Sequence, residues 1–310
     1  MYAAESHGRI RFRAVGQAIA FPLLYIFAVF RHGLLPFSIA GLASWAILRN
    51  AMPEGFDLKN PAEVRTALLN NWPLLAACYA VNVIAMSIYA VGIHRMIIGS
   101  VSPSFPFIRF KRHELAYLGA AMIFAVIMAL TNGVLLASFW FLAREAGFAI
   151  QSIRGGGEGD APTLVWLLSV LAAVAAIVLV LQISTRFVLI LPHAAVSGRI
   201  AIGPSWRAMQ GNVWLFIELS VILWIFIVAL GVALVFALGS LTDTIGAFLT
   251  PYLSALRLEI ASDRLKDMIG IGLLAVFSVM ATTMNIALLS FIYRDLGVEW
   301  SDAAAEHGYA

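Results

Sequence analysis

Residues 219–242, "LSVILWIFIVALGVALVFALGSLT", contain no charged side chain. A helix that crosses about 30 Å of hydrocarbon at about 1.5 Å per residue needs roughly 20 apolar residues, and this stretch exceeds that length. Four other charge-free runs do the same, namely residues 66–93, 115–143, 161–185 and 268–293. The chain is therefore predicted to hold five membrane-spanning helices downstream of its N-terminal part.

The composition of the whole chain supports a membrane protein. Hydrophobic residues make up 62% and charged residues 12% of the sequence, and the mean hydropathy is +0.91. A soluble domain has about 45–50% apolar residues and about 25% charged ones. The pI near 9.2 does not indicate nucleic-acid binding, because the basic residues are scattered without a cluster interleaved with aromatics.

The N-terminal part contains two shorter apolar runs, residues 14–30 and 33–48, which Arg31 and His32 separate. Either run alone is marginal for a span. Arg9, Arg13 and Gln17 recur every four residues and share one helical face, which favours an amphipathic helix in the membrane interface. From these residues alone, the first run either spans the membrane or lies in the interface.

The charges between the spans decide the orientation. The loop with Arg95, Arg109, Lys111 and Arg112 and the loop with Arg199 and Arg207 are basic, whereas residues 49–71, 144–162 and 243–267 hold most of the acidic residues. The basic loops are predicted to be cytoplasmic. Six spans with an interfacial first helix keep the basic N-terminal tail on that side.

The predicted fold is thus an all-α, polytopic helical bundle with six transmembrane helices and an N-terminal interfacial amphipathic helix. Residues 1–310 form a single integral membrane domain: a cytoplasmic tail and interfacial helix (1–32), six spans (33–293) and a cytoplasmic tail (294–310). The expected location is the bacterial inner membrane, with both termini in the cytoplasm.

Ionisable side chains within the spans are the main candidates for function, because each costs about 2.5–3.5 kcal/mol at the helix centre. Arg186 and Glu218 are predicted to lie at similar depth on antiparallel neighbours, and Arg95 is a second possible partner. Either these residues contact a substrate or proton in a polar cavity, or they form a structural ion pair between two helices. The candidate cavity would also include Asn82, Asn132 and Asn285.

Small residues predict where the fifth span packs. Ala229, Ala233 and Ala237 recur every four residues, and such stripes allow close approach of helices. A contact between the fourth and fifth spans would bring Arg186 and Glu218 together.

Motifs for catalysis or metal binding are absent from the sequence. His94 and His193 have no His or Cys partner at ligand spacing, and there is no nucleophile motif. The single cysteine, Cys78, excludes an intrachain disulfide. The sequence therefore predicts no enzyme, no cofactor and no metal.

Some local patterns point to a family. Arg186 is followed by Pro192, a Ser-Trp-Arg run at 205–207 leads into Gly-Asn-Val-Trp at 211–214, and Tyr-Arg-Asp-Leu follows the last span at 293–296. This pattern resembles the membrane domain of glycerophosphoryl diester phosphodiesterases and related six-helix bacterial membrane proteins of uncharacterised function. The resemblance covers mainly the second half of the chain, and it implies structural signatures without catalytic roles.

The chain departs from that family in two respects. Ser197 stands where relatives often place an acid shortly after the proline, and the catalytic barrel of the diesterases is missing because six spans and their loops occupy the sequence. We therefore expect a non-enzymatic accessory or scaffold component of envelope or lipid processes. The alternative is a transporter or channel for a small solute or lipid that uses Arg186 and Glu218, and an embedded enzyme comes third. The expected partners are the lipid bilayer and other membrane proteins or a second copy, but no nucleic acid.

Overall fold

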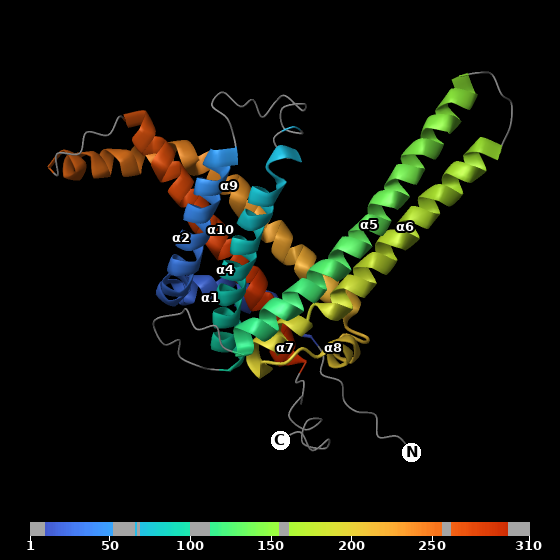
Figure 1. The fold of residues 1–310 in the computed structure, drawn as a ribbon, viewed down its shortest axis with the longest axis horizontal. Helices are drawn as coiled ribbons and strands as arrows, with labels where there is room; N and C mark the ends of the chain where they lie inside the picture. The colour runs from blue at the N-terminus through green and yellow to red at the C-terminus, as the bar shows by residue number, and fades with distance from the viewer. Residues whose placement is uncertain are drawn as a thin grey trace, which may run out of the picture. The chain divides into compact units, whose positions relative to one another are not determined.

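The computed structural model describes residues 10–51, 66, 69–99, 112–154, 161–255 and 262–296, and within these ranges the regular structure is entirely helical (Figure 1). The helices are α1 (Arg13–Leu24), α2 (Ile26–Ala51), α4 (Trp72–Ile98), α5 (Arg112–Arg154), α6 (Ala161–Phe187), α7 (Ile190–Ser197), α8 (Ile202–Ala208), α9 (Val213–Ala255) and α10 (Ser262–Asp295). The prediction of an all-α chain is confirmed.

Six helical segments of the described chain are long and apolar enough to cross a membrane, as the sequence predicts. They are Ile26–Ala46, Trp72–Ile98, Arg112–Ser138, Val170–Ser197, Val213–Tyr252 and Met268–Asp295. The fold is therefore that of a multi-pass helical membrane protein. Helix α1 is apolar but too short to span.

The chain forms two compact units. The hairpin unit comprises the described residues from 112 to 216, with α5 to α8, together with Leu296. The bundle unit comprises the described residues among 10–99 and 217–295, with α1, α2, α4, α10 and nearly all of α9. The sequence pattern treats the six spans as one domain and does not distinguish these units, because both are built from the same kind of apolar helix.

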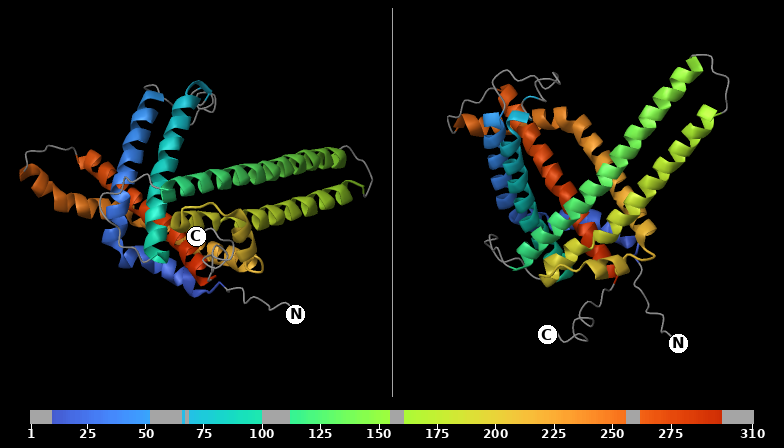
Figure 2. Two further views of the ribbon diagram at one scale, coloured as in Figure 1. Left: turned by 60° about the horizontal axis from the view of Figure 1, so that its bottom comes forward. Right: turned by 45° about the vertical axis from the view of Figure 1, so that its right-hand side comes forward.

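In the hairpin unit, α5 and α6 run antiparallel along each other, and α7 and α8 lie at the base of this hairpin (Figures 1 and 2). The chain folds back at this base, where α6 ends at Phe187 and α7 ends at Ser197, just before Gly198. Gly198 has φ +67° and its N–H donates to the carbonyl of Ala194 at 3.0 Å, a left-handed helix end that favours glycine. An added Cβ at Gly198 would lie 3.2 Å from His113 Nδ1, so the turn after α7 is seated against the start of α5.

In the bundle unit, α4 packs against both α2 and α10, and α1 packs along the C-terminal part of α10. Ala14 and Ala18 of α1 are fully buried, and Phe21 contacts Phe291 edge-on at a centroid distance of 6.3 Å. Arg13 forms an ion pair of 3.3 Å with the buried carboxylate of Asp295.

Gln17 also contacts α10: its Oε1 accepts a hydrogen bond from Arg294 at 3.3 Å. Gln17 and Arg13 therefore share one face of α1, as their spacing predicts, and this face meets the end of α10. Arg9, the third residue of the predicted polar face, lies outside the described residues.

The boundary between α1 and α2 differs from the predicted one. The helices meet at Tyr25, whereas the sequence pattern divides the two apolar runs at Arg31 and His32. Both residues lie inside α2, with Arg31 exposed and His32 buried. His32 fits because it faces Gly92 of α4, where an added Cβ would lie 3.6 Å from His32 Nδ1.

Helix α9 buries a different stripe from the one its alanines indicate. Leu219, Leu223 and Ile227 are buried, whereas Ala229 and Ala233 are exposed. Farther along the buried stripe, an added Cβ at Gly231 would lie 3.1 Å from the ring of Phe277 on α10. Gly231 therefore marks a close approach of α9 to α10. The predicted contact of the alanine stripe with the fourth span would join the two units and stays a prediction.

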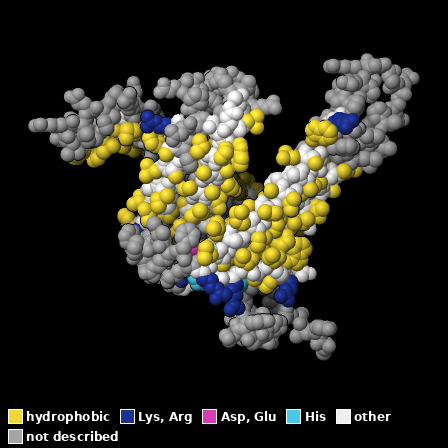
Figure 3. All heavy atoms as spheres, in the orientation of Figure 1, with side chains coloured by type: hydrophobic (Ala, Val, Ile, Leu, Met, Phe, Trp, Pro, Cys, Tyr) yellow, Lys and Arg dark blue, Asp and Glu magenta, His cyan; other side chains and the backbone are white. Residues whose placement is uncertain are grey.

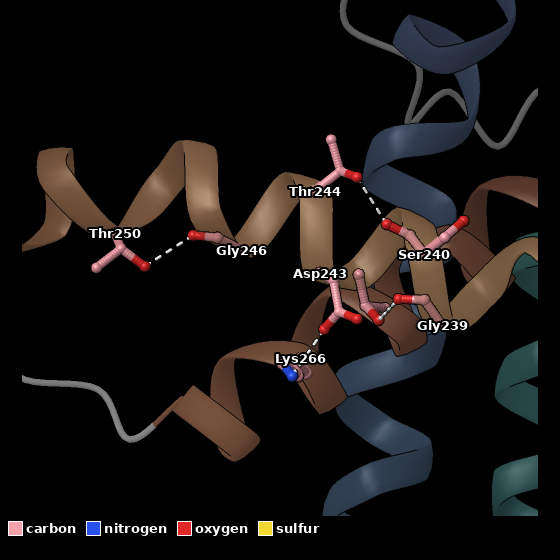
Figure 4. A network of polar contacts seen from close by, with 8 residues as sticks. Gly239, Ser240, Asp243, Thr244, Gly246, Thr250 and Lys266 are labelled. Atoms are coloured by element: carbon pink, nitrogen blue, oxygen red, sulfur yellow. Dashed lines mark hydrogen bonds and ion pairs between the residues drawn. The ribbon is translucent and has the colours of Figure 1, made fainter.

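The C-terminal part of α9 changes direction after its most apolar stretch (Figures 1 and 4). Thr242 donates to the carbonyl of Gly239 at 2.9 Å and Thr244 to that of Ser240 at 2.7 Å, and such back-bonding by hydroxyls bends helices. Asp243 pairs with Lys266 at the start of α10 at 2.7 Å. Beyond the bend, α9 continues to Ala255.

The sequence also predicts a short surface helix that starts at Asn60 and a flexible glycine-rich connector at 154–160; Asn60 and residues 155–160 lie outside the described residues.

Candidate functional site

The polar cluster at the base of the hairpin unit is centred on Arg186, one residue before the end of α6. Its guanidinium carbon lies 4.4 Å from the centroid of the Trp206 ring on α8, a distance typical of a cation–π contact. The Trp206 ring also packs against Phe187 at a centroid distance of 5.3 Å. We call Arg186, Phe187, Ser205 and Trp206 the Arg186 cluster.

The Arg186 cluster is held together by a hydrogen bond from α8 to α6. The Ser205 hydroxyl donates to the carbonyl of Arg186 at 2.8 Å, and Ser205 is fully buried. The last four carbonyls of a helix have no partner within that helix, so Ser205 satisfies one that the end of α6 leaves open. The Ser-Trp-Arg run of the sequence thus has a structural reason: its serine locks α8 in place and its tryptophan covers the arginine.

Ser197, the position where the chain departs from the family pattern, closes the turn between α7 and α8. Its hydroxyl donates to the carbonyl of His193 at 2.9 Å and accepts from the backbone N–H of Arg199 at 3.1 Å. It also lies 3.1 Å from His193 Nε2. These bonds stabilise the end of α7, and a carboxylate could not donate the first of them.

Glu218 lies on α9 in the bundle unit, near the start of the apolar span. Its side chain is exposed, and among the described residues of that unit none forms a hydrogen bond or ion pair with its carboxylate. Arg186 belongs to the other unit. Their pairing stays a prediction, which a double-mutant cycle on Arg186→Gln and Glu218→Gln would decide.

The three candidate asparagines each bond to the carbonyl four residues earlier in their own helix: Asn82 to Cys78, Asn132 to Met128 and Asn285 to Ala281, at 2.7–2.8 Å. Only Asn82 reaches another helix, donating to Ser44 Oγ of α2 at 2.7 Å. Asn132 is exposed and lies in the hairpin unit, and Arg95 is half-buried near the end of α4. These residues belong to both units, and their assembly into one polar cavity stays a prediction.

A buried polar seam between α4 and α10 is not among the sequence candidates. Tyr89 hydrogen-bonds to Thr283, and His94 Nδ1 lies 2.7 Å from Ser290 Oγ. His94, Thr283 and Ser290 are fully buried and Tyr89 is almost so. Thr283 and Ser290 are seven residues apart, about two helical turns, and so share a face. That spacing is the sequence signal from which the seam could have been found.

The described residues contain no group of three His, Cys, Asp or Glu side chains that could hold a metal ion. No family model, curated protein or solved structure matches the chain. The candidate sites are therefore judged by their own geometry: the Arg186 cluster in one unit, and the polar seam and Glu218 in the other.

Proposed function

We propose that the chain is a non-catalytic, multi-pass protein of the bacterial inner membrane that acts as an accessory or scaffold component of envelope or lipid processes. In this proposal both termini face the cytoplasm, the partners are lipid and other membrane proteins or a second copy, and the relationship to the membrane domain of glycerophosphoryl diester phosphodiesterases is one of architecture.

The observation that carries the proposal is that polar side chains inside the bundle unit form hydrogen bonds between its helices. Tyr89 and His94 of α4 bond to α10, and Asn82 of α4 bonds to α2. Hydrogen bonds of this kind hold transmembrane helices together. Polar groups that serve a catalytic site or a transport path must meet a substrate, whereas these are engaged between helices. This arrangement supports a structural role for the bundle unit.

Exposed apolar positions provide the test of the scaffold role. Phe236 on α9 is 86% exposed, whereas Leu223 on the same helix is fully buried. A photo-crosslinking amino acid at position 236, in cells that make the full chain, should yield a discrete adduct with one membrane protein or with a second copy. The same amino acid at position 223 is the matched control and should yield no intermolecular adduct. Lipid adducts alone at position 236 and at the exposed Leu136 of α5 would contradict the proposal.

Transport of a small solute or lipid is the second candidate, favoured by the exposed carboxylate of Glu218 within an apolar span. An intramembrane carboxylate is costly and often functional. The transport proposal expects solute flux in liposomes that Glu218→Gln abolishes without lowering the melting temperature. Asp243→Asn on the same helix, which removes the ion pair with Lys266, is the control and should leave flux intact. Wild-type liposomes without flux above protein-free vesicles would favour the scaffold.

A further inference from the structure

The side chain of Arg186 carries more hydrogen-bond donors than its own unit uses. A guanidinium has five N–H donors in its plane, whereas the contact with Trp206 engages only its face. Among the described residues of the hairpin unit, none accepts a hydrogen bond from this side chain, and its Nε atom is buried. A buried donor of this kind calls for a water molecule or an anion as its acceptor.

The Arg186 cluster holds this guanidinium in a defined place. Ser205 fixes α8 to the end of α6 through the Arg186 carbonyl. The Trp206 ring is packed on one side by Phe187 and covers the arginine. Because the ring cannot shift without breaking these contacts, the edge of the guanidinium is pre-oriented. A planar, pre-oriented fork is the arrangement that binds phosphate through two parallel hydrogen bonds.

The surroundings of the Arg186 cluster are basic. Arg112, Arg199 and Arg207 are exposed at the same end of the hairpin, where Figure 3 shows a gathering of Lys and Arg side chains. An added Cβ at Gly198 would lie 3.3 Å from Arg112 Cγ, so the turn that carries Arg199 lies against the start of α5. Glu114 is the one acidic side chain among the described residues at this end. The net positive charge favours an anion.

Arg186 also lies at the edge of an apolar segment. It is the first charged residue after the run 161–185, which exceeds the roughly 20 residues that cross the hydrocarbon. The segment Val170–Ser197 that can span the membrane continues beyond Arg186, and a long arginine side chain can extend its charge toward the lipid headgroups. We propose that the Arg186 cluster binds a phosphate group. An anionic phospholipid supplies this group, from the leaflet that contains the base of the hairpin unit. The proposal does not depend on the scaffold role.

Lipid binding by the purified full chain tests the site. The probes are phosphatidylglycerol and phosphatidylcholine, added separately in mild detergent, with bound lipid counted by native mass spectrometry. Wild type should retain phosphatidylglycerol in preference to phosphatidylcholine, and Arg186→Gln should weaken phosphatidylglycerol binding about tenfold, as expected for a lost charged hydrogen bond. Arg207→Gln, a matched loss of charge on α8, should weaken it less than about twofold.

Three outcomes would overturn the proposal. If Arg186→Gln and Arg207→Gln weaken phosphatidylglycerol binding equally, the lipid is attracted by the basic surface in general and not by the Arg186 cluster. If wild type retains phosphatidylglycerol and phosphatidylcholine equally, there is no site for an anion. Release of phosphatidylglycerol by a large excess of inorganic phosphate would show that the source is free phosphate and not lipid.

A second pair of variants covers the case in which Arg186→Gln does not fold. Trp206→Phe keeps an aromatic face and should weaken phosphatidylglycerol binding less than Trp206→Leu does. Trp206→Leu removes the cation–π contact and should weaken binding about fivefold. Equal binding by these two variants, with melting temperatures close to wild type, would exclude the pre-oriented arginine.

Discussion

The pair of His94 and Ser290 shows how single polar residues position helices in this protein. Both are fully buried, one on α4 and one on α10, and their side chains meet at 2.7 Å. Ser290 also bonds to the carbonyl of Ile286 in its own helix at 2.9 Å. The serine thus retains a partner when the histidine is removed, and the loss of the interhelical bond should have a moderate cost.

We expect a double-mutant cycle on His94→Ala and Ser290→Ala to give a coupling energy of about 0.6 kcal/mol and at most about 1.7 kcal/mol, the range for hydrogen bonds between transmembrane helices. The free energy of unfolding in detergent is the measured quantity. The single change His94→Ala should cost more than the coupling, because it also leaves a cavity.

Asn285→Ala supplies the control for this cycle. Asn285 lies on α10 as well but bonds to Ala281 of its own helix, so its coupling with His94→Ala should be close to zero. If Asn285→Ala and Ser290→Ala gave equal coupling energies with His94→Ala, the coupling would reflect a general change in α10 and not the hydrogen bond between His94 and Ser290.

At the residue scale, the sequence singles out Arg186 but not the buried polar seam between α4 and α10. Arg186 is singled out by its charge, and the structure gives it a defined neighbour in Trp206. The pairs Tyr89 with Thr283 and His94 with Ser290 depend on which faces of α4 and α10 meet. That choice is made by packing between segments far apart in the chain. The spacing of Thr283 and Ser290 indicates that they share a face of α10, but not that this face meets α4.

At the scale of elements, the glycines of α2 report how closely it approaches α4. An added Cβ at Gly33 would lie 3.0 Å from the Phe37 ring and 3.2 Å from the Tyr89 ring of α4. These two rings are packed edge-on at a centroid distance of 5.0 Å. Neither ring can move away freely, because Tyr89 is also bonded to Thr283.

Gly33→Ala should therefore destabilise the protein by about 1–3 kcal/mol, as overpacking does. Gly41→Ala in the same helix meets no atom within 4 Å and should stabilise it by about 0.5–1 kcal/mol through the lower flexibility of alanine. Thermal unfolding of the two variants in one detergent measures the difference. Equal melting temperatures would mean that α2 and α4 do not approach as closely as the structure has them.

A helix can be predicted from the sequence where a charge-free run is long enough to cross the bilayer. The five long runs correspond to α4, α5, α6, α9 and α10, because each apolar run must satisfy its backbone within one helix to cross a bilayer. The N-terminal boundary is less predictable, since Arg31 and His32 read as a break in the apolar pattern. His32 is accommodated by Gly92 on another helix, a fact that the local sequence does not contain.

At the scale of the whole molecule, orientation is a prediction that labelling checks. In a Cys78→Ala background, a cysteine at Gly155 should react with an impermeant maleimide added to intact spheroplasts. A cysteine at Gln210, which is exposed after α8, should react only after permeabilisation, because the basic Arg199 and Arg207 predict that this side is cytoplasmic. The opposite pattern would invert the topology and place the Arg186 cluster in the outer leaflet.

The packing of α1 against the end of α10 also determines when α1 can reach its final position during synthesis. Arg13 and Asp295 are 282 residues apart in sequence, and synthesis at about 5–20 residues per second separates them by about 15–55 s. For that interval the buried face of α1, with Ala14, Ala18 and Phe21, has no α10 to contact. Helix α1 thus reaches its partner α10 only after every other described helix of the bundle unit has been made.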